Sequence, residues 1–166
     1  MALATIPSGD VWVQIGTTQT PTSGSSVSFT SIPAVKKLRL VVQNIALTTT
    51  GSLDITINND TSSIYNQSYL NYNGTTTVTA ALNTVAIDTT RAGGASAHIQ
   101  DFIIDYANQA CPKLITGFGS NNGSNPNHYG IVANYNSTAV VNRVDFVTAN
   151  TFNATNTGTI AIYGAY

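Results

Sequence analysis

Apolar and polar residues alternate with a period of two along much of the chain. Leu53, Ile55 and Ile57 are separated by polar residues, a spacing that places these three side chains on one face of a β-strand. β-Branched and aromatic residues are common in the alternating segments, as expected for half-buried strands. Together with residues 53–57, the pattern predicts strands at Val11–Ile15, Ser26–Thr30, Leu38–Val42, Tyr65–Tyr72, Ala97–Ile104, Lys113–Gly119, Tyr129–Tyr135, Val140–Thr148 and Ile160–Ile162.

Segments rich in Gly, Pro, Asn and Ser separate these strands, as turns do. A helical alternative exists for Thr79–Ile87 and Ile103–Ala110, although Thr and Val weaken both. Many short strands at this spacing predict an all-β fold, a single antiparallel β-sandwich of jelly-roll type with about eight to ten strands. We assign this domain to residues 11–166. Residues 1–10 begin with mostly apolar residues and continue with Pro7, Ser8 and Gly9. This change of character predicts an arm that becomes ordered against a neighbouring molecule.

The polar positions carry hydroxyls and amides more often than charges. Thr (25), Asn (18) and Ser (14) make up 57 of the 166 residues, whereas Asp, Lys and Arg together number 13 and Glu is absent. The lack of Glu argues against long helices, and the net charge of −1 argues against nucleic-acid binding through phosphates. No apolar run is long enough for a membrane helix, and the N-terminus lacks the basic region of a secretory signal. We therefore expect neither nucleic acid nor membrane as a partner.

Candidate catalytic groups are few and badly spaced. Asp101 and Asp105 share a strand face, but their Cα atoms should lie about 13 Å apart, which is too far for a retaining glycosidase pair. His98, His128 and Cys111 do not have zinc-site spacing. No Gly-x-Ser-x-Gly motif marks a nucleophile elbow. We predict that the protein is not an enzyme and has no catalytic residue, metal site or cofactor.

Two segments leave a binding role open. Asn58, Asn59 and Asp60 offer oxygen ligands for Ca²⁺, but an Asx turn explains them equally well. Tyrosines at positions 65, 69 and 72 are interleaved with amide side chains, a combination that could recognise sugars. They could equally pack on one face of a strand and hydrogen-bond through their hydroxyls.

Four segments stand out in their order along the chain: Val13–Thr17, Val27–Pro33, Lys37–Val42 and Gly158–Gly164. Taken together, they resemble a family of small tailed-bacteriophage virion proteins with a jelly-roll β-sandwich. Asn58–Tyr72 and Ile99–Ala107 fit the middle of the family pattern more loosely. Similar domains serve as capsid decoration proteins, head fibres and tail-fibre modules.

The resemblance implies a capsid decoration or cement protein, located in the virion and assembled in the host cytoplasm. Such a protein would bind itself, as a homotrimer, and the major capsid protein or another virion protein. The alternatives are a tail or fibre module that binds host glycans through Tyr65, Tyr69 and Tyr72, and, more remotely, a bacterial lectin. The residues we expect to contact the capsid or a partner are Leu3, Ile6, Pro7, Lys36 and Lys37.

Overall fold

The computed structural model describes residues 10–49, 51–71, 76–91, 98–121 and 127–166, and these residues fold as strands joined by turns and loops. The strands are β1 (Trp12–Gln19), β2 (Ser26–Thr30), β3 (Lys37–Gln43), β4 (Gly51–Ile57), β5 (Tyr65–Asn71), β6 (Thr76–Leu82), β7 (Val85–Arg91), β8 (His98–Asp105), β9 (Lys113–Asn121), β10 (Asn127–Tyr135), β11 (Arg143–Val147) and β12 (Thr159–Ala165). The described residues contain no helix long and apolar enough to cross a membrane.

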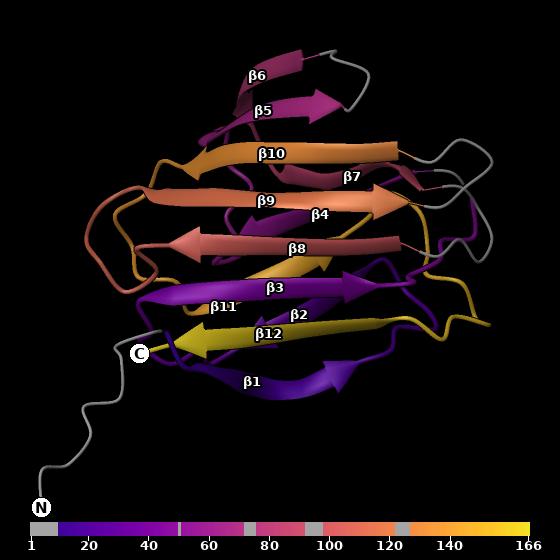
Figure 1. Cartoon of the computed structure of the whole chain (residues 1–166), viewed down its shortest axis with the longest axis horizontal. Coiled ribbons are helices and arrows are strands. Elements are labelled where there is room, and N and C mark those ends of the chain that lie inside the picture. The colour runs from indigo at the N-terminus through magenta and orange to yellow at the C-terminus, as the bar shows by residue number, and fades with distance from the viewer. Residues whose placement is uncertain (1–9, 50, 72–75, 92–97, 122–126) are drawn as a thin grey trace, which may run out of the picture.

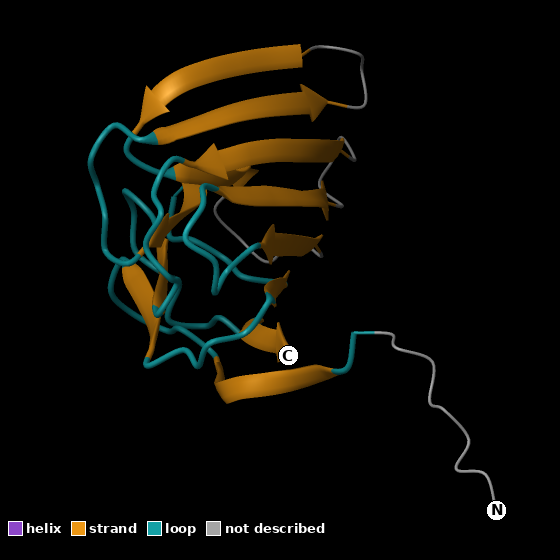
Figure 2. Ribbon diagram, turned by 90° about the vertical axis from the view of Figure 1, so that its left-hand side faces the viewer, coloured by secondary structure: helices purple, strands orange, loops and turns teal. Residues whose placement is uncertain are grey.

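The strands form two antiparallel sheets that pack face to face (Figure 1). The large sheet has eight strands in the order β1-β12-β3-β8-β9-β10-β5-β6, and the small sheet has four in the order β2-β11-β4-β7. Figure 2 shows that the large sheet curves around the small one. β1 and β2 are consecutive in sequence but lie at the edges of different sheets, and the same is true of β6 and β7. The chain therefore passes from one sheet to the other at both edges of the sandwich.

The core lies between the two sheets and follows the predicted alternation. In β3, Leu38, Leu40 and Val42 are completely buried, whereas the residues between them are partly exposed. From the small sheet, Phe29 and Phe146 enter the core and contact each other edge to face, with ring centroids 6.0 Å apart. Burial of apolar side chains from both sheets is the main stabilising contribution to this fold.

The predicted β-sandwich is confirmed, while the jelly-roll type and the division into arm and domain stay predictions. Each of the ten predicted segments contains a strand, although only Arg143–Val147 is extended within Val140–Thr148. The helical alternatives are wrong. Residues 79–87 belong to β6, a short turn and β7, and β8 ends before Tyr106, whose φ of 62° is incompatible with continuing either a strand or a helix.

Candidate functional site

The tyrosines of β5 and β10 lie inside the sandwich and stack on one another. The ring centroids of Tyr65 and Tyr135 are 5.0 Å apart, as are those of Tyr69 and Tyr129. Tyr65 is completely buried and Tyr69 is 6% exposed. The predicted glycan contact through these two residues is therefore wrong, because other core side chains cover their ring faces. Tyr72 lies outside the described residues.

Polar groups on β5 link the two sheets. The Tyr65 hydroxyl accepts a hydrogen bond from the Ile57 backbone N–H at the end of β4, with 2.9 Å between N and O. The Gln67 side-chain amide donates to the Ala86 carbonyl (2.6 Å) and accepts from the Ala86 N–H (3.1 Å). Burial raises the pKa of Tyr65 above its usual range, so the phenol stays neutral. These contacts confirm the packing interpretation of the tyrosine-rich strand.

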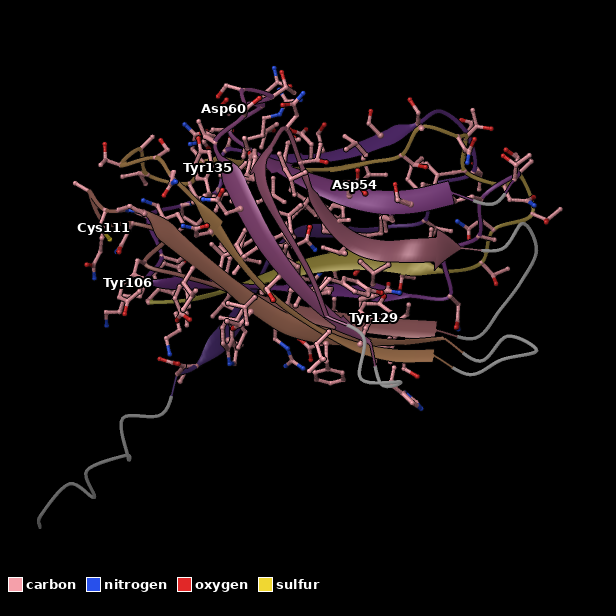
Figure 3. The ribbon with its side chains drawn as sticks, turned by 90° about the horizontal axis from the view of Figure 1, so that it is seen from above. Asp54, Asp60, Tyr106, Cys111, Tyr129 and Tyr135 are labelled. Atoms are coloured by element: carbon pink, nitrogen blue, oxygen red, sulfur yellow. The ribbon has the colours of Figure 1, made fainter. Side chains whose placement is uncertain are left out.

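The Asn58–Asp60 segment uses its oxygen atoms within the fold. Asn58 has a φ of 56° and accepts two backbone N–H bonds from the segment that enters β11. Asp60 accepts hydrogen bonds from the Ser62 N–H (3.0 Å) and from the Tyr135 hydroxyl (3.2 Å; Figure 3). The Ser62 hydroxyl also donates to Asp60 and lowers the pKa of its carboxyl. These bonds favour the turn explanation over a calcium site.

The residues considered for catalysis do not come together. His128 is exposed, Cys111 is half-buried before β9, and the side chain of His98 lies outside the described part. Asp101 and Asp105 each form an ion pair with a basic residue of β3. Among the described residues, no three His, Cys, Asp or Glu side chains are close enough to hold a metal ion.

The predicted partner-contact residues fall into two groups. Lys36 donates to the Tyr166 carbonyl (3.0 Å), and Lys37 forms ion pairs with Asp10 (2.8 Å) and Asp105 (3.9 Å). Both lysines keep exposed surface, and their contact with a partner stays a prediction. The arm residues, which lie outside the described part of the chain, are Leu3, Ile6 and Pro7.

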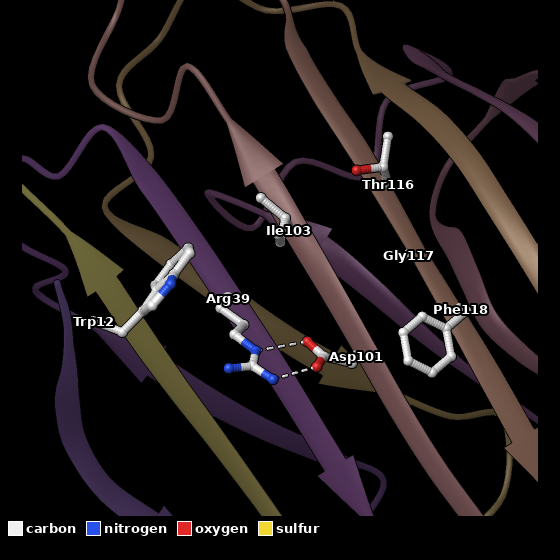
Figure 4. A pocket seen from close by; sticks show the side chains of 7 residues that line it. All are labelled: Trp12, Arg39, Asp101, Ile103, Thr116, Gly117 and Phe118. Carbon is white, nitrogen blue, oxygen red and sulfur yellow. Dashed lines mark hydrogen bonds and ion pairs between the residues drawn. The ribbon is translucent and has the colours of Figure 1, made fainter. Parts of the chain in front are cut away.

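A shallow pocket with a volume of about 340 Å³ opens on the outer face of the large sheet (Figure 4). The strand register explains why its residues share this face, because Arg39 of β3 pairs with Ile103 of β8, and Asp101 of β8 pairs with Phe118 of β9. The pocket is lined by Trp12, Arg39, Asp101, Ile103, Thr116, Gly117 and Phe118.

An ion pair forms the polar part of this pocket. Arg39 Nε donates to Asp101 Oδ1 at 2.8 Å, and Nη2 donates to Oδ2, so the contact is bidentate. The Arg39 side chain is 41% exposed and that of Asp101 is 18% exposed. Trp12 and Phe118 lie on opposite sides of the pair (Figure 4). The pocket therefore combines two aromatic side chains with a charged pair whose net charge is zero.

This pocket was not predicted from the sequence, although part of the signal was present. Phe118 occupies an outward position in its strand, where an aromatic side chain is unexpected unless it has a partner. Trp12 is the only tryptophan in the chain. Arg39 and Asp101, however, are 62 residues apart, and only the pairing of β3 with β8 brings them together.

The outer face of the large sheet is divided into two halves. The ion pairs of Lys37 and Arg39 lie on the half formed by β1, β12, β3 and β8. On the other half, β5, β6, β9 and β10 contain only one charged residue, Lys113, whose side chain is buried. We call the second half the uncharged half-sheet. Its exposed apolar residues include Leu70, Leu114 and Val132.

Asp54 of β4 is a carboxylate with an incomplete set of hydrogen bonds. Its Oδ2 accepts from the Thr84 hydroxyl (3.0 Å), whereas Oδ1 is buried without a hydrogen-bond partner among the described residues. Burial raises the pKa of this carboxyl because it disfavours the charged form. Stability should therefore fall as pH rises from the unfolded-state pKa of 3.8 through the higher folded-state value.

We expect Asp54→Asn to raise the free energy of unfolding by about 1 kcal/mol at pH 7, because a neutral amide costs less to bury. The gain should disappear near pH 3, where both states of the wild type carry a protonated Asp54. The matched control is Asp145→Asn, which should destabilise the protein because Asp145 accepts bonds from Arg143 and Ser28. Urea unfolding at both pH values measures the effect, and equal gains at pH 3 and pH 7 would contradict it.

Comparison with known proteins provides no family for this chain. No protein-family model, no curated protein and no solved structure matches it.

Proposed function

We propose that the chain is a non-enzymatic structural protein of a phage virion, most simply a capsid decoration protein, and that its copies associate through the uncharged half-sheet. The observation that carries the self-association is the combination of exposed apolar residues with the absence of exposed Lys, Arg, Asp and Glu over four adjacent strands. The virion assignment is supported by the resemblance of the sequence segments described above.

Three of the exposed apolar residues of the uncharged half-sheet form a diagonal across three strands. Leu114 of β9, Val132 of β10 and Leu70 of β5 are 37%, 54% and 50% exposed. Val132 pairs with Thr116 of β9 and with Ser68 of β5. Leu114 lies two residues from Thr116, and Leu70 lies two residues from Ser68, so each is the next residue on the same face. Exposed apolar clusters with polar surroundings are typical of protein interfaces.

A second copy of the chain fits this surface better than a charged partner does. Around a rotation axis each side chain meets symmetry-related copies of its neighbours, so exposed charges of one sign would repel one another. The side chains around the diagonal are hydroxyls and amides, among them Ser68, Asn66 and Asn134, which can both donate and accept across a symmetric contact. We therefore propose a closed homo-oligomer, with a trimer as the expected form.

In this proposal the oligomer stabilises the capsid mechanically. Each copy contributes a weak contact to the capsid lattice, and several linked contacts produce durable attachment. Lys36 and Lys37 would supply part of this contact. A decoration protein should be present in numbers comparable to those of the major capsid protein, whereas a tail or fibre module should be present in few copies. Quantitative mass spectrometry of purified particles distinguishes these roles, and absence of the chain from particles would contradict both.

Val132→Asp should convert the oligomer into monomers, because it places a charge in the contact. A buried, unpaired carboxylate should weaken association by about a hundredfold, or about 2.7 kcal/mol. The mass in solution, measured by sedimentation equilibrium, reports this change.

Val140→Asp is the matched control, since Val140 is 43% exposed and lies in the loop before β11 rather than on the uncharged half-sheet. It should leave the mass unchanged. A Val132→Asp variant that keeps the wild-type mass, or a monomeric wild type, would contradict association through this face.

A further inference from the structure

The pocket between Trp12 and Phe118 lies at the boundary between the two halves of the outer face, because Arg39 and Asp101 belong to the charged half and Phe118 belongs to β9. We propose that it binds an uncharged carbohydrate, with one or two sugar rings lying between the two aromatic side chains and above the Arg39–Asp101 pair. This role goes beyond the structural function proposed above.

The electrostatics of the pocket favour an uncharged ligand. Arg39 and Asp101 neutralise each other through two hydrogen bonds, so neither an anionic nor a cationic ligand would meet a net opposite charge. Nη1 of Arg39 donates to no described residue, and the carboxylate oxygens of Asp101 each have a further lone pair. The pair can therefore donate to and accept from hydroxyl groups without breaking its own contact.

The remaining lining favours a ring with one apolar face. Phe118 is 58% exposed, and aromatic rings of this kind contact the C–H faces of other molecules through dispersion and hydrophobic burial. Thr116 adds a hydroxyl next to Phe118. The volume of about 340 Å³ lies at the small end of the range for ligand sites, which suits one or two rings.

A purely apolar occupant is the less favourable choice. An apolar side chain in the pocket would remove water from the ion pair and leave its free donor and acceptors without partners, which costs free energy. Sugar hydroxyls, in contrast, would replace the hydrogen bonds that water makes with the ion pair. The same consideration disfavours the chain's own apolar residues 1–9 as the occupant, although the test includes them.

Tryptophan fluorescence gives a specific assay, because Trp12 is the only tryptophan in the chain. We would titrate the full-length protein with glucose, galactose, mannose, N-acetylglucosamine, lactose, maltotriose and cellotriose, and with sialic acid as a charged comparison. At least one neutral sugar should change the emission of Trp12 saturably, whereas sialic acid should leave this emission unchanged. If only sialic acid produces a change, the proposed neutral ligand is wrong.

Phe118→Ala should weaken the best sugar by about tenfold, as expected for the loss of one aromatic contact. Asp101→Asn should weaken it at least as much. Tyr106→Ala is the control, since Tyr106 is 48% exposed but does not line the pocket, and it should bind normally. Far-UV circular dichroism checks that each variant is folded.

Two outcomes would overturn the proposal. The first is the absence of any response across the neutral sugars. The second is a saturable response to a synthetic peptide of residues 1–9 together with none to sugars, which would assign the pocket to the chain's own N-terminal segment. Either result is distinguishable from failure of the self-association proposal, because association is measured by the mass of Val132→Asp in solution and sugar binding by the fluorescence of Trp12.

Discussion

Replacing Lys113 by Met should lower the free energy of unfolding by about 3 kcal/mol, which is a large fraction of the stability of an ordinary domain. Lys113 begins β9, is completely buried, and donates to the backbone carbonyls of Gln109 (2.7 Å), Cys111 and Ser137 (3.4 Å). Met keeps most of the side-chain volume but leaves these carbonyls without their donor. Burial already lowers the pKa of Lys113, so the ammonium is held by these hydrogen bonds in spite of its desolvation.

Lys36→Met makes the same change on the surface, where Lys36 is exposed and donates to the Tyr166 carbonyl. Lys36→Met should change the free energy of unfolding by no more than about 0.5 kcal/mol. Urea unfolding of both variants at pH 7 gives the comparison. Equal losses for the two variants would show that the three carbonyls do not depend on Lys113.

Gly117→Ala should also destabilise the protein by about 3 kcal/mol, which is at the upper end for overpacking. Gly117 of β9 faces the core directly opposite Phe102 of β8. An added Cβ would lie 2.3 Å from the Phe102 ring and 2.4 Å from the Asp101 carbonyl oxygen. The second contact is with backbone, so a change of side-chain rotamer cannot relieve it.

Gly130→Ala is the matched control on the neighbouring strand. A Cβ there would meet only the Gly117 carbonyl oxygen, at 4.0 Å. Because Ala restricts the unfolded chain more than Gly does, this variant should be neutral or more stable by about 0.5 kcal/mol. Thermal and urea unfolding both report the difference. A Gly117→Ala variant as stable as Gly130→Ala would contradict the prediction, because it would show that β8 and β9 admit the added Cβ without loss of stability.

The alternation of side chains was sufficient to predict the sandwich, because one face of most strands is buried and the other is not. Leu38, Leu40 and Val42 illustrate this, since all three are inside and the intervening Arg39 is partly exposed. Residues 79–87 were harder to interpret because Thr and Ala dominate β6. Side chains of this size distinguish poorly between helix and strand, and tertiary pairing decides the outcome.

The candidate sites depend on contacts that local patterns do not contain. The spacing of Tyr65 and Tyr69 was compatible with surface stacking and with packing in the core, and only the position of β10 beside β5 decides for the core. The Trp12–Phe118 pocket needs β1, β3, β8 and β9 in one sheet in a particular order. Predicting it from sequence would have required the strand order as well as the strands.

The order of strands also has a consequence for how the chain can fold during synthesis. β12 inserts between β1 and β3 and pairs with both, so the first of the described strands to leave the ribosome finds its neighbour in the last. Until residues 159–165 emerge, β1 lacks its partner strand in the large sheet, and the backbone groups of β3 that pair with β12 lack their hydrogen bonds. Completion of the large sheet is therefore a late step of folding, and pairings over such long sequence separations are slow to form.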